Sequence, residues 1–124
     1  MSQVASSRQA ISRGVVALFK ESFGRGPTLG RTFINADVIT VLLQDTLTAV
    51  ERTLCDTGKA EMVVEMRRNY QDAIGTQLIA LVERETGRRV KALMSDHSVE
   101  PDYAIVCFVL EDAAEISSGA GAGN

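Results

Sequence analysis

Arg67 is the residue whose type and position most clearly call for an explanation in chemical terms. At 100° per residue it lies inside the apolar stripe of a long predicted helix, whose other members are Val63, Met66, Tyr70, Ile74, Leu78 and Leu81. A guanidinium on a buried face keeps its proton, so it needs a carboxylate, carbonyl oxygens or an anionic ligand. Two interpretations follow. Arg67 pairs with an acid such as Asp45 or Glu111 while its stem packs on apolar surface, or it forms part of an anion or partner site.

His97 is the only histidine, and it stands among the acids Asp96, Glu100 and Asp102. One histidine with nearby acids can act as a general base, but no nucleophile or oxyanion donor can be assigned to accompany it. A zinc site would need a second imidazole or thiol at ligand spacing, and the chain offers none. We therefore predict no metal and no catalytic residue, and expect an exposed loop over residues 96–102. A small enzyme using His97 and Asp96 is the alternative.

The first element that positions these residues is an amphipathic helix over residues 4–23. Apolar side chains recur along it at steps of three and four, at Ile11, Val15, Leu18 and Phe19. Gly24, Gly26 and Pro27 then end the helix, because glycine accepts a left-handed cap and proline cannot continue a helical turn.

Two β-hairpins are predicted, one on each side of a helical middle segment. The first joins residues 31–34 to residues 38–44 through the turn-forming sequence Asn-Ala-Asp. The second joins residues 89–95 to residues 103–110. The run at 38–44 is apolar on both sides, which is typical of an inner strand.

The middle segment begins with a capping box formed by Thr48 and Glu51, in which each side chain satisfies a backbone donor of the other. The helix is predicted to pause at residues 56–58, to resume over residues 59–86, and to end at Gly87. Together these elements give an α+β fold in the order helix, hairpin, one or two helices, hairpin. We expect a four-stranded antiparallel sheet with helices on one face, in a single domain over residues 1–116. A disordered Gly/Ala/Ser tail is expected at 117–124.

Composition narrows the classes of partner. The chain has 124 residues, 45% of them hydrophobic and 23% charged, with a net charge of -3 and scattered basic residues. This pattern lacks the basic stripe of a nucleic-acid-binding protein. No run reaches the roughly 20 apolar residues of a membrane span, so we expect a cytoplasmic chain without direct membrane insertion. Apolar residues on both sides of two strands favour a homo-oligomer, with a dimer as the expected form.

Several short motifs occur in a characteristic order. They are GRGP at 24–27, DTLTAVERTL at 45–54, Arg67 on the long helix, TGRRV at 86–90, SD at 95–96 and FVLE at 108–111. In this order and spacing, over residues 8–111, the chain resembles the MpsC-like family of small bacterial proteins, formerly a domain of unknown function.

The resemblance implies a functional setting. Members are associated with a bacterial system that generates membrane potential by cation translocation, or that accumulates inorganic carbon through related membrane subunits. For this chain, the resemblance implies the role of a non-enzymatic accessory or regulatory cytosolic subunit without a cofactor. Membrane-protein partners would hold this subunit at the inner face of the membrane. The partner would dock on the sheet or on residues 95–102. The matched positions are Gly24, Gly26, Arg31, Arg67, Thr86, Gly87, Ser95 and Asp96.

An anion sensor is the second hypothesis. Arg31 and Arg67, with nearby backbone donors, would bind bicarbonate or a nucleotide through charge-assisted hydrogen bonds.

Overall fold

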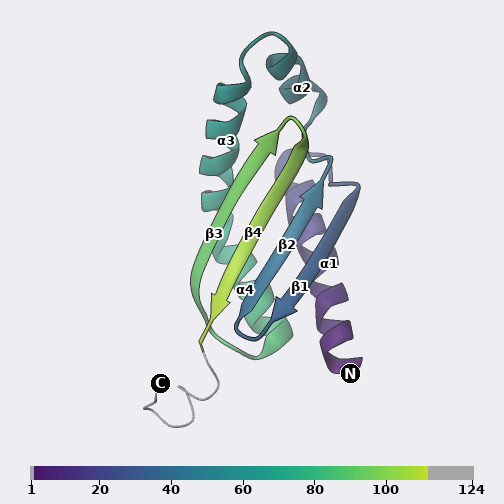
Figure 1. The fold of residues 1–124 in the computed structure, drawn as a ribbon, viewed down its shortest axis with the longest axis vertical. Coiled ribbons are helices and arrows are strands. Elements are labelled where there is room, and N and C mark those ends of the chain that lie inside the picture. Colours follow the sequence, from purple (N-terminus) through teal and green to yellow (C-terminus); the bar gives the residue numbers. More distant parts are fainter. Residues whose placement is uncertain (1, 112–124) are drawn as a thin grey trace.

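The computed structural model describes residues 2–111, which form four helices and four strands (Figure 1). In chain order these are α1 Ser2–Phe23, β1 Leu29–Asn35, β2 Val38–Gln44, α2 Ala49–Asp56, α3 Ala60–Ala73, α4 Gly75–Thr86, β3 Val90–Val99 and β4 Asp102–Leu110. The predicted α+β class is confirmed. The predicted tail at 117–124 and the domain boundary at residue 116 lie outside the described residues and stay predictions.

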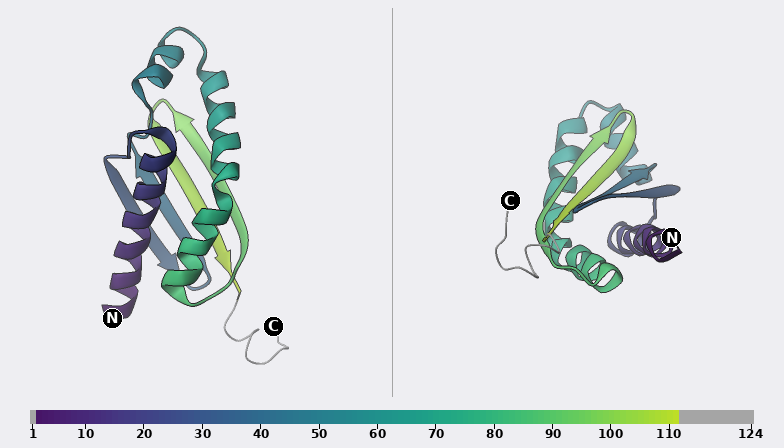
Figure 2. Two further views of the ribbon diagram at one scale, coloured as in Figure 1. Left: turned by 180° about the vertical axis from the view of Figure 1, so that it is seen from behind. Right: turned by 60° about the horizontal axis from the view of Figure 1, so that its bottom comes forward.

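The four strands form one antiparallel sheet in the order β1-β2-β4-β3. The second strand of each hairpin is therefore an inner strand, as predicted for residues 38–44. Helices α1, α3 and α4 lie against one face of the sheet, and Figure 2 shows this layer from behind. The opposite face carries no helix in the described part of the chain.

The hydrophobic core lies between the sheet and this helical layer. Alternate residues of the inner strands point into it, because successive side chains of a strand face opposite sides. The buried members include Ile39, Val41, Leu43, Val106, Phe108, Ile11, Val15, Phe19, Leu78 and Val82. Gly14 brings α1 and α4 close together, since a Cβ there would lie only 2.6 Å from the Cδ1 atom of Leu81.

The long helix predicted over residues 59–86 is divided at Ile74, so that prediction is wrong in its continuity. Ile74 leaves the helical conformation with φ -93° and ψ 9°, and α4 begins at the next residue. The break lets α3 pack against β3 while α4 packs against α1. The predicted apolar stripe is also wrong within α3, because Met66 and Tyr70 are 42% and 41% exposed, while the buried face of this helix carries Val63, Arg67 and Gln71.

The predicted loop at 96–102 is also wrong. Strand β3 continues to Val99, and His97 pairs with Ala104 of β4, leaving a two-residue turn at Glu100 and Pro101. The polar composition of this segment is typical of a loop. Here, however, the polar side chains alternate between the two faces of an extended strand, and Asp96 and Ser98 point away from the core.

Candidate functional site

Arg67 forms the centre of a buried polar cluster at the end of the sheet nearest α2. Its side chain is 0% exposed and contacts Glu51 at two points, Nε to Oε2 at 2.7 Å and Nη2 to Oε1 at 2.6 Å. Nη2 also donates to the backbone carbonyl of Thr46 at 2.7 Å. The predicted partners Asp45 and Glu111 were therefore wrong. A two-point arginine–carboxylate contact fixes both side chains in one plane and is among the stronger protein hydrogen-bond arrangements.

Glu51 has two structural tasks, because it is also the acid of the predicted capping box. Its Oε1 atom accepts from the backbone N–H of Thr48 at 2.8 Å, and the Thr48 hydroxyl accepts from the N–H of Glu51 at 3.2 Å. The capping box is thus confirmed. It orients the Glu51 carboxylate at the first turn of α2, where the carboxylate meets α3.

The electrostatics of this pair favour the charged forms. Burial alone would raise the pKa of Glu51, but hydrogen bonds from Arg67 and Thr48 together lower it below the ordinary glutamate value. The guanidinium carbon of Arg67 also lies 3.7 Å from the centroid of the Phe23 ring, a cation–π contact. Phe23 in turn contacts Tyr70, with ring centroids 4.7 Å apart. The end of α1 thereby covers the arginine.

Thr46 connects Arg67 to a second set of polar groups around His97. The Thr46 hydroxyl donates to Asp102 Oδ1 at 3.0 Å and lies 2.6 Å from His97 Nε2. Because the hydroxyl proton is directed to the carboxylate, its lone pair can accept from Nε2–H, which fits a neutral ring protonated at Nε2. Burial lowers the pKa of His97, and the nearby Arg67 charge lowers it further, so the neutral form is favoured.

Asp102 holds the loop between β2 and α2 in place. Its carboxylate accepts from the backbone N–H groups of Thr46 at 3.0 Å and Leu47 at 2.9 Å, and pairs with Arg52 at 3.2 Å. Arg25 fixes the same loop from the other side, donating to the carbonyls of Asp45 and Leu47 at 2.8 Å each. The loop is thus tied to β4 and to the connection that follows α1.

Some buried polar atoms of this cluster have no hydrogen-bond partner among the described residues. They are Arg67 Nη1, His97 Nδ1 and both amide atoms of Gln71, whose side chain is 1% exposed. Gln71 lies one helical turn after Arg67 on the same side of α3. An unsatisfied buried amide lowers the stability of the fold.

The other predicted ligand candidates are not part of this cluster. Arg31 lies on β1, at the opposite edge of the sheet from β3, with its guanidinium carbon 5.8 Å from the Phe33 ring centroid. Asp96 is exposed on β3 and pairs with Arg68 at 2.9 Å. Ser95 is half-buried on β3, opposite Val106. Of the five candidates, only Arg67 and His97 are brought together, through Thr46.

The predicted structural residues lie at element ends. Gly24 has φ 80° directly after α1, and Gly87 has φ 71° at the end of α4, both in the left-handed region that favours glycine. The Thr86 hydroxyl donates to the carbonyl of Val82 at 2.7 Å and accepts from the N–H of Arg88 at 3.1 Å. Pro27 is buried in the connection to β1, and Gly26 packs near Lys20.

Sequence reasoning missed Thr46 and Arg25, and it named Asp102 only as one of the acids near His97. No local pattern marks the contacts of these three residues, because their partners are distant in the chain. Glu51 was found only as a cap. The spacing of the two residues was a signal for the ion pair of Glu51 with Arg67. A capping glutamate 16 residues before a buried arginine can contact that arginine when the two short helices that carry them fold back on each other.

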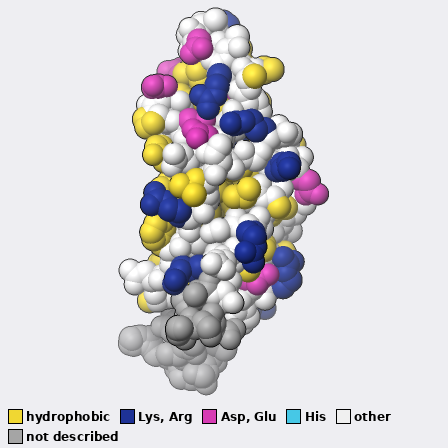
Figure 3. Space-filling model, turned by 90° about the vertical axis from the view of Figure 1, so that its right-hand side faces the viewer, with side chains coloured by type: hydrophobic (Ala, Val, Ile, Leu, Met, Phe, Trp, Pro, Cys, Tyr) yellow, Lys and Arg dark blue, Asp and Glu magenta, His cyan; other side chains and the backbone are white. Residues whose placement is uncertain are grey.

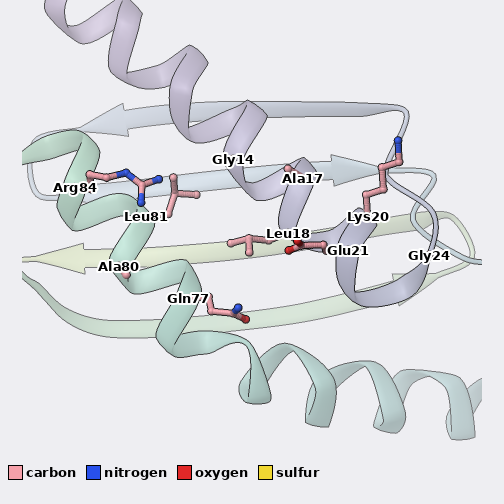
Figure 4. A pocket seen from close by; sticks show the side chains of 10 residues that line it. All are labelled: Gly14, Ala17, Leu18, Lys20, Glu21, Gly24, Gln77, Ala80, Leu81 and Arg84. Atoms are coloured by element: carbon pink, nitrogen blue, oxygen red, sulfur yellow. The ribbon is translucent and has the colours of Figure 1, made fainter.

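An open groove lies on the helical side, between α1 and α4, with a volume of about 750 Å³. Its lining is mostly small or apolar, and the ten residues are Gly14, Ala17, Leu18, Lys20, Glu21, Gly24, Gln77, Ala80, Leu81 and Arg84. Figure 4 shows Arg84 and Lys20 toward opposite ends of this groove, with Leu18 and Leu81 between them. We call this the α1–α4 groove.

A metal-binding cluster and a membrane-spanning helix are both absent from the part of the chain that the structure describes. No group of three or more His, Cys, Asp or Glu side chains among residues 2–111 could hold a metal ion. Within the same range, none of the helices combines the length and hydropathy needed to cross a membrane.

Comparison with known proteins places the chain in a family. A family model described as "MpsC: Na+-translocating membrane potential-generating system (MpsC)" matches residues 4–112. No curated protein and no solved structure matches the chain. The matched range covers nearly all of the described residues, including the buried cluster and the α1–α4 groove. The chain therefore belongs to the MpsC family, whose name links it to a Na+-translocating system that generates membrane potential.

Proposed function

We propose that this chain is a non-enzymatic accessory subunit of the Na+-translocating system named by its family. It acts from the cytosolic side by holding a segment of a membrane-embedded partner. The observation that carries the proposal is the α1–α4 groove, an open depression lined mostly by small and apolar side chains. A lining of this kind suits a protein segment better than a small polar substrate.

The ionisable residues that could do chemistry support the same proposal, because most of their hydrogen-bonding atoms already hold the fold, and Arg67 Nη1 and His97 Nδ1, which have no partner among the described residues, are buried. Arg67 binds Glu51 and a backbone carbonyl, and His97 binds Thr46. Asp102 holds two backbone N–H groups. A general acid or base must exchange protons with a bound substrate, and these groups are buried within their own hydrogen bonds.

The shape of the α1–α4 groove favours a helical partner segment. Gly14, Ala17 and Ala80 have little or no side chain, so a partner helix can approach the backbones of α1 and α4 closely. Lys20 and Arg84 lie toward the two ends, where they would attract acidic side chains of an amphipathic helix. The expected partner segment therefore has an apolar face with small residues and an acidic side chain toward each of its two ends.

The test is affinity purification of the tagged chain from its native host with detergent-solubilised membranes. Wild type should recover a membrane-embedded subunit of a cation-translocating system. Ala80→Trp should abolish this recovery by filling the groove, because Ala80 is exposed there and the larger ring occupies the space of the partner.

The matched control is Ala73→Trp, which adds the same ring at an exposed helical position outside the groove. It should recover the partner as wild type does. Recovery that Ala80→Trp leaves unchanged would contradict docking in the groove, and recovery of no membrane subunit by wild type would contradict the accessory role.

Binding of a small anion is a second candidate, favoured by a different groove. Arg8, Arg13 and Arg31 line a depression of about 470 Å³ between α1 and β1, whose described lining residues include no acid. Figure 3 shows the side of the molecule that carries these elements, with basic side chains distributed along its length. Arg67 is not available for this role, because its guanidinium already holds the Glu51 carboxylate.

Thermal unfolding in the presence of bicarbonate, phosphate and nucleotides tests this candidate. A saturable rise in melting temperature with one anion over chloride supports it, provided that Arg8→Ala and Arg13→Ala together remove the rise. Equal melting temperatures across the panel exclude it.

A further inference from the structure

The open face of the sheet carries apolar side chains from all four strands. Residues that alternate with the buried core positions point to this side. Among them Phe33 on β1 is 50% exposed, Met94 on β3 is 55% exposed, and Ile105 on β4 is 40% exposed. Figure 1 views the molecule from this face, with the helices behind the sheet. Exposed apolar side chains that gather on one face are typical of interaction surfaces.

The strand register arranges this face in cross-strand rows, one of which has opposite charges at its two ends. Arg31 pairs with Leu42, Leu42 pairs with Ile105, and Ile105 pairs with Asp96. The row therefore runs from a basic residue at the β1 edge, across two apolar residues, to an acidic residue at the β3 edge. The neighbouring row carries no charge and consists of Phe33, Thr40, Cys107 and Met94.

We propose that this face is the interface of a homodimer with a two-fold axis parallel to the strands, in which Arg31 of each copy pairs with the partner's Asp96. Rotation about such an axis places β1 over β3 of the other copy and β2 over its β4. Leu42 then faces Ile105 of the partner subunit, and Phe33 faces the partner's Met94. Each dimer contains two identical charge pairs around an apolar centre, as an isologous interface requires.

The charges favour this axis over a two-fold axis that lies in the face perpendicular to the strands. An axis lying in the face but perpendicular to the strands would place each strand over its own copy. Arg31 would then lie near the partner's Arg31 at one edge, and Asp96 near the partner's Asp96 at the other, which is repulsive. Asp96 already accepts from Arg68 of its own chain at both carboxylate oxygens and from the backbone N–H of His97 at Oδ1. A carboxylate has about four acceptor sites, so one remains for the partner's Arg31.

The size of the face is adequate for a specific contact. Four strands about 4.8 Å apart and seven residues of about 3.4 Å each cover roughly 19 by 24 Å. When the area of this face is summed over both subunits, and the area added by protruding side chains is included, the buried surface approaches the roughly 1,000 Å² expected of a specific interface. The inference goes beyond the proposed accessory function, because the two use opposite sides of the molecule. A dimer of this kind would present two α1–α4 grooves outward.

Sedimentation velocity with charge-reversal variants tests the dimer. Wild type should sediment as a dimer at micromolar concentration. Arg31→Glu and Asp96→Arg should each weaken the dimer by about tenfold or more, because each replaces two attractive contacts per dimer with two repulsive ones. An equimolar mixture of the two variants should restore dimers, since every contact in the mixed pair again joins opposite charges.

Hydrophobic variants on and off the face complete the test. Phe33→Glu should also weaken the dimer, whereas Val50→Glu, at a 70% exposed position on α2, should leave it unchanged. Circular dichroism confirms that each variant is folded. Monomeric wild type, dimers insensitive to Arg31→Glu and Phe33→Glu, or a mixture that fails to restore association would each overturn the proposal. Ala80→Trp, which fills the α1–α4 groove, should leave the dimer unchanged, and this separates the test of the dimer from the test of the accessory function.

Discussion

Arg67 of α3 and Glu51 of α2 meet in a buried two-point ion pair, with Nη2 to Oε1 at 2.6 Å and Nε to Oε2 at 2.7 Å. The same carboxylate caps α2 through Thr48, and the same guanidinium holds the Thr46 carbonyl. A single pair therefore ties together two helices and the loop that follows β2. Its position explains why an arginine stands in an otherwise apolar stripe.

Removing one partner of this pair should destabilise the fold strongly. Arg67→Met is expected to lower the free energy of unfolding by about 3–5 kcal/mol, because it leaves the Glu51 carboxylate buried without its counter-charge. Adding Glu51→Leu should recover part of that loss, since the double variant buries no unpaired charge. Urea denaturation of the two single variants and the double variant measures the coupling.

Additive losses in this cycle would show that Arg67 and Glu51 do not stabilise the protein as a pair. Arg67→Lys provides a second measurement if Arg67→Met does not fold. It keeps the charge but loses the planar fork, so it should fall between wild type and Arg67→Met in stability.

His97 should make stability depend on pH between about pH 7 and pH 5. Burial and then Arg67 lower its pKa in the folded protein, while Asp102, Glu51 and Asp96 act in the opposite direction. The unfolded chain has the ordinary histidine pKa of about 6.5 and so takes up a proton first as the pH falls. The free energy of unfolding should therefore decrease below about pH 6.5.

His97→Gln isolates this effect, because the glutamine amide can still donate to the Thr46 hydroxyl but does not titrate. The unfolding free energy of His97→Gln should change less between pH 7 and pH 5 than that of wild type. Both proteins should lose stability below about pH 4.5, where the lowered pKa values of Glu51 and Asp96 begin to matter. Parallel curves over the whole range would refute a titrating role for His97.

Gln71 is a position where substitution should stabilise the protein. Its buried amide has no hydrogen-bond partner among the described residues, so Gln71→Leu is expected to raise the free energy of unfolding by about 1 kcal/mol. Gln77→Leu makes the same change at an exposed position of α4 and should stay within about 0.5 kcal/mol of wild type. A clear loss of stability in Gln71→Leu would mean that the amide contributes hydrogen bonds after all.

Sequence predicted the parts of this fold that depend on neighbouring residues. The Thr48–Glu51 cap and the left-handed Gly87 are set by chemistry within one helical turn, and the inner position of residues 38–44 follows from their apolar faces. These features need no knowledge of the tertiary arrangement.

The errors occurred where tertiary contacts override local composition. His97 and its neighbours are polar enough for a loop, yet pairing with β4 extends the strand through them. The break at Ile74 carries no proline, and it is made by the competing packing of α3 on β3 and α4 on α1. The partner of Arg67 depends on how α2 folds back on α3, which no local pattern encodes.

The most direct test of the central claim is the membrane potential of host cells in which the chromosomal copy of this chain is deleted. Complementation by wild type and by Ala73→Trp should restore the potential, measured with a voltage-sensitive dye, while Ala80→Trp should leave it at the level of the deletion strain. Full restoration by Ala80→Trp, or a deletion strain with an undiminished potential, would contradict the account of this chain as an accessory subunit that works through its α1–α4 groove.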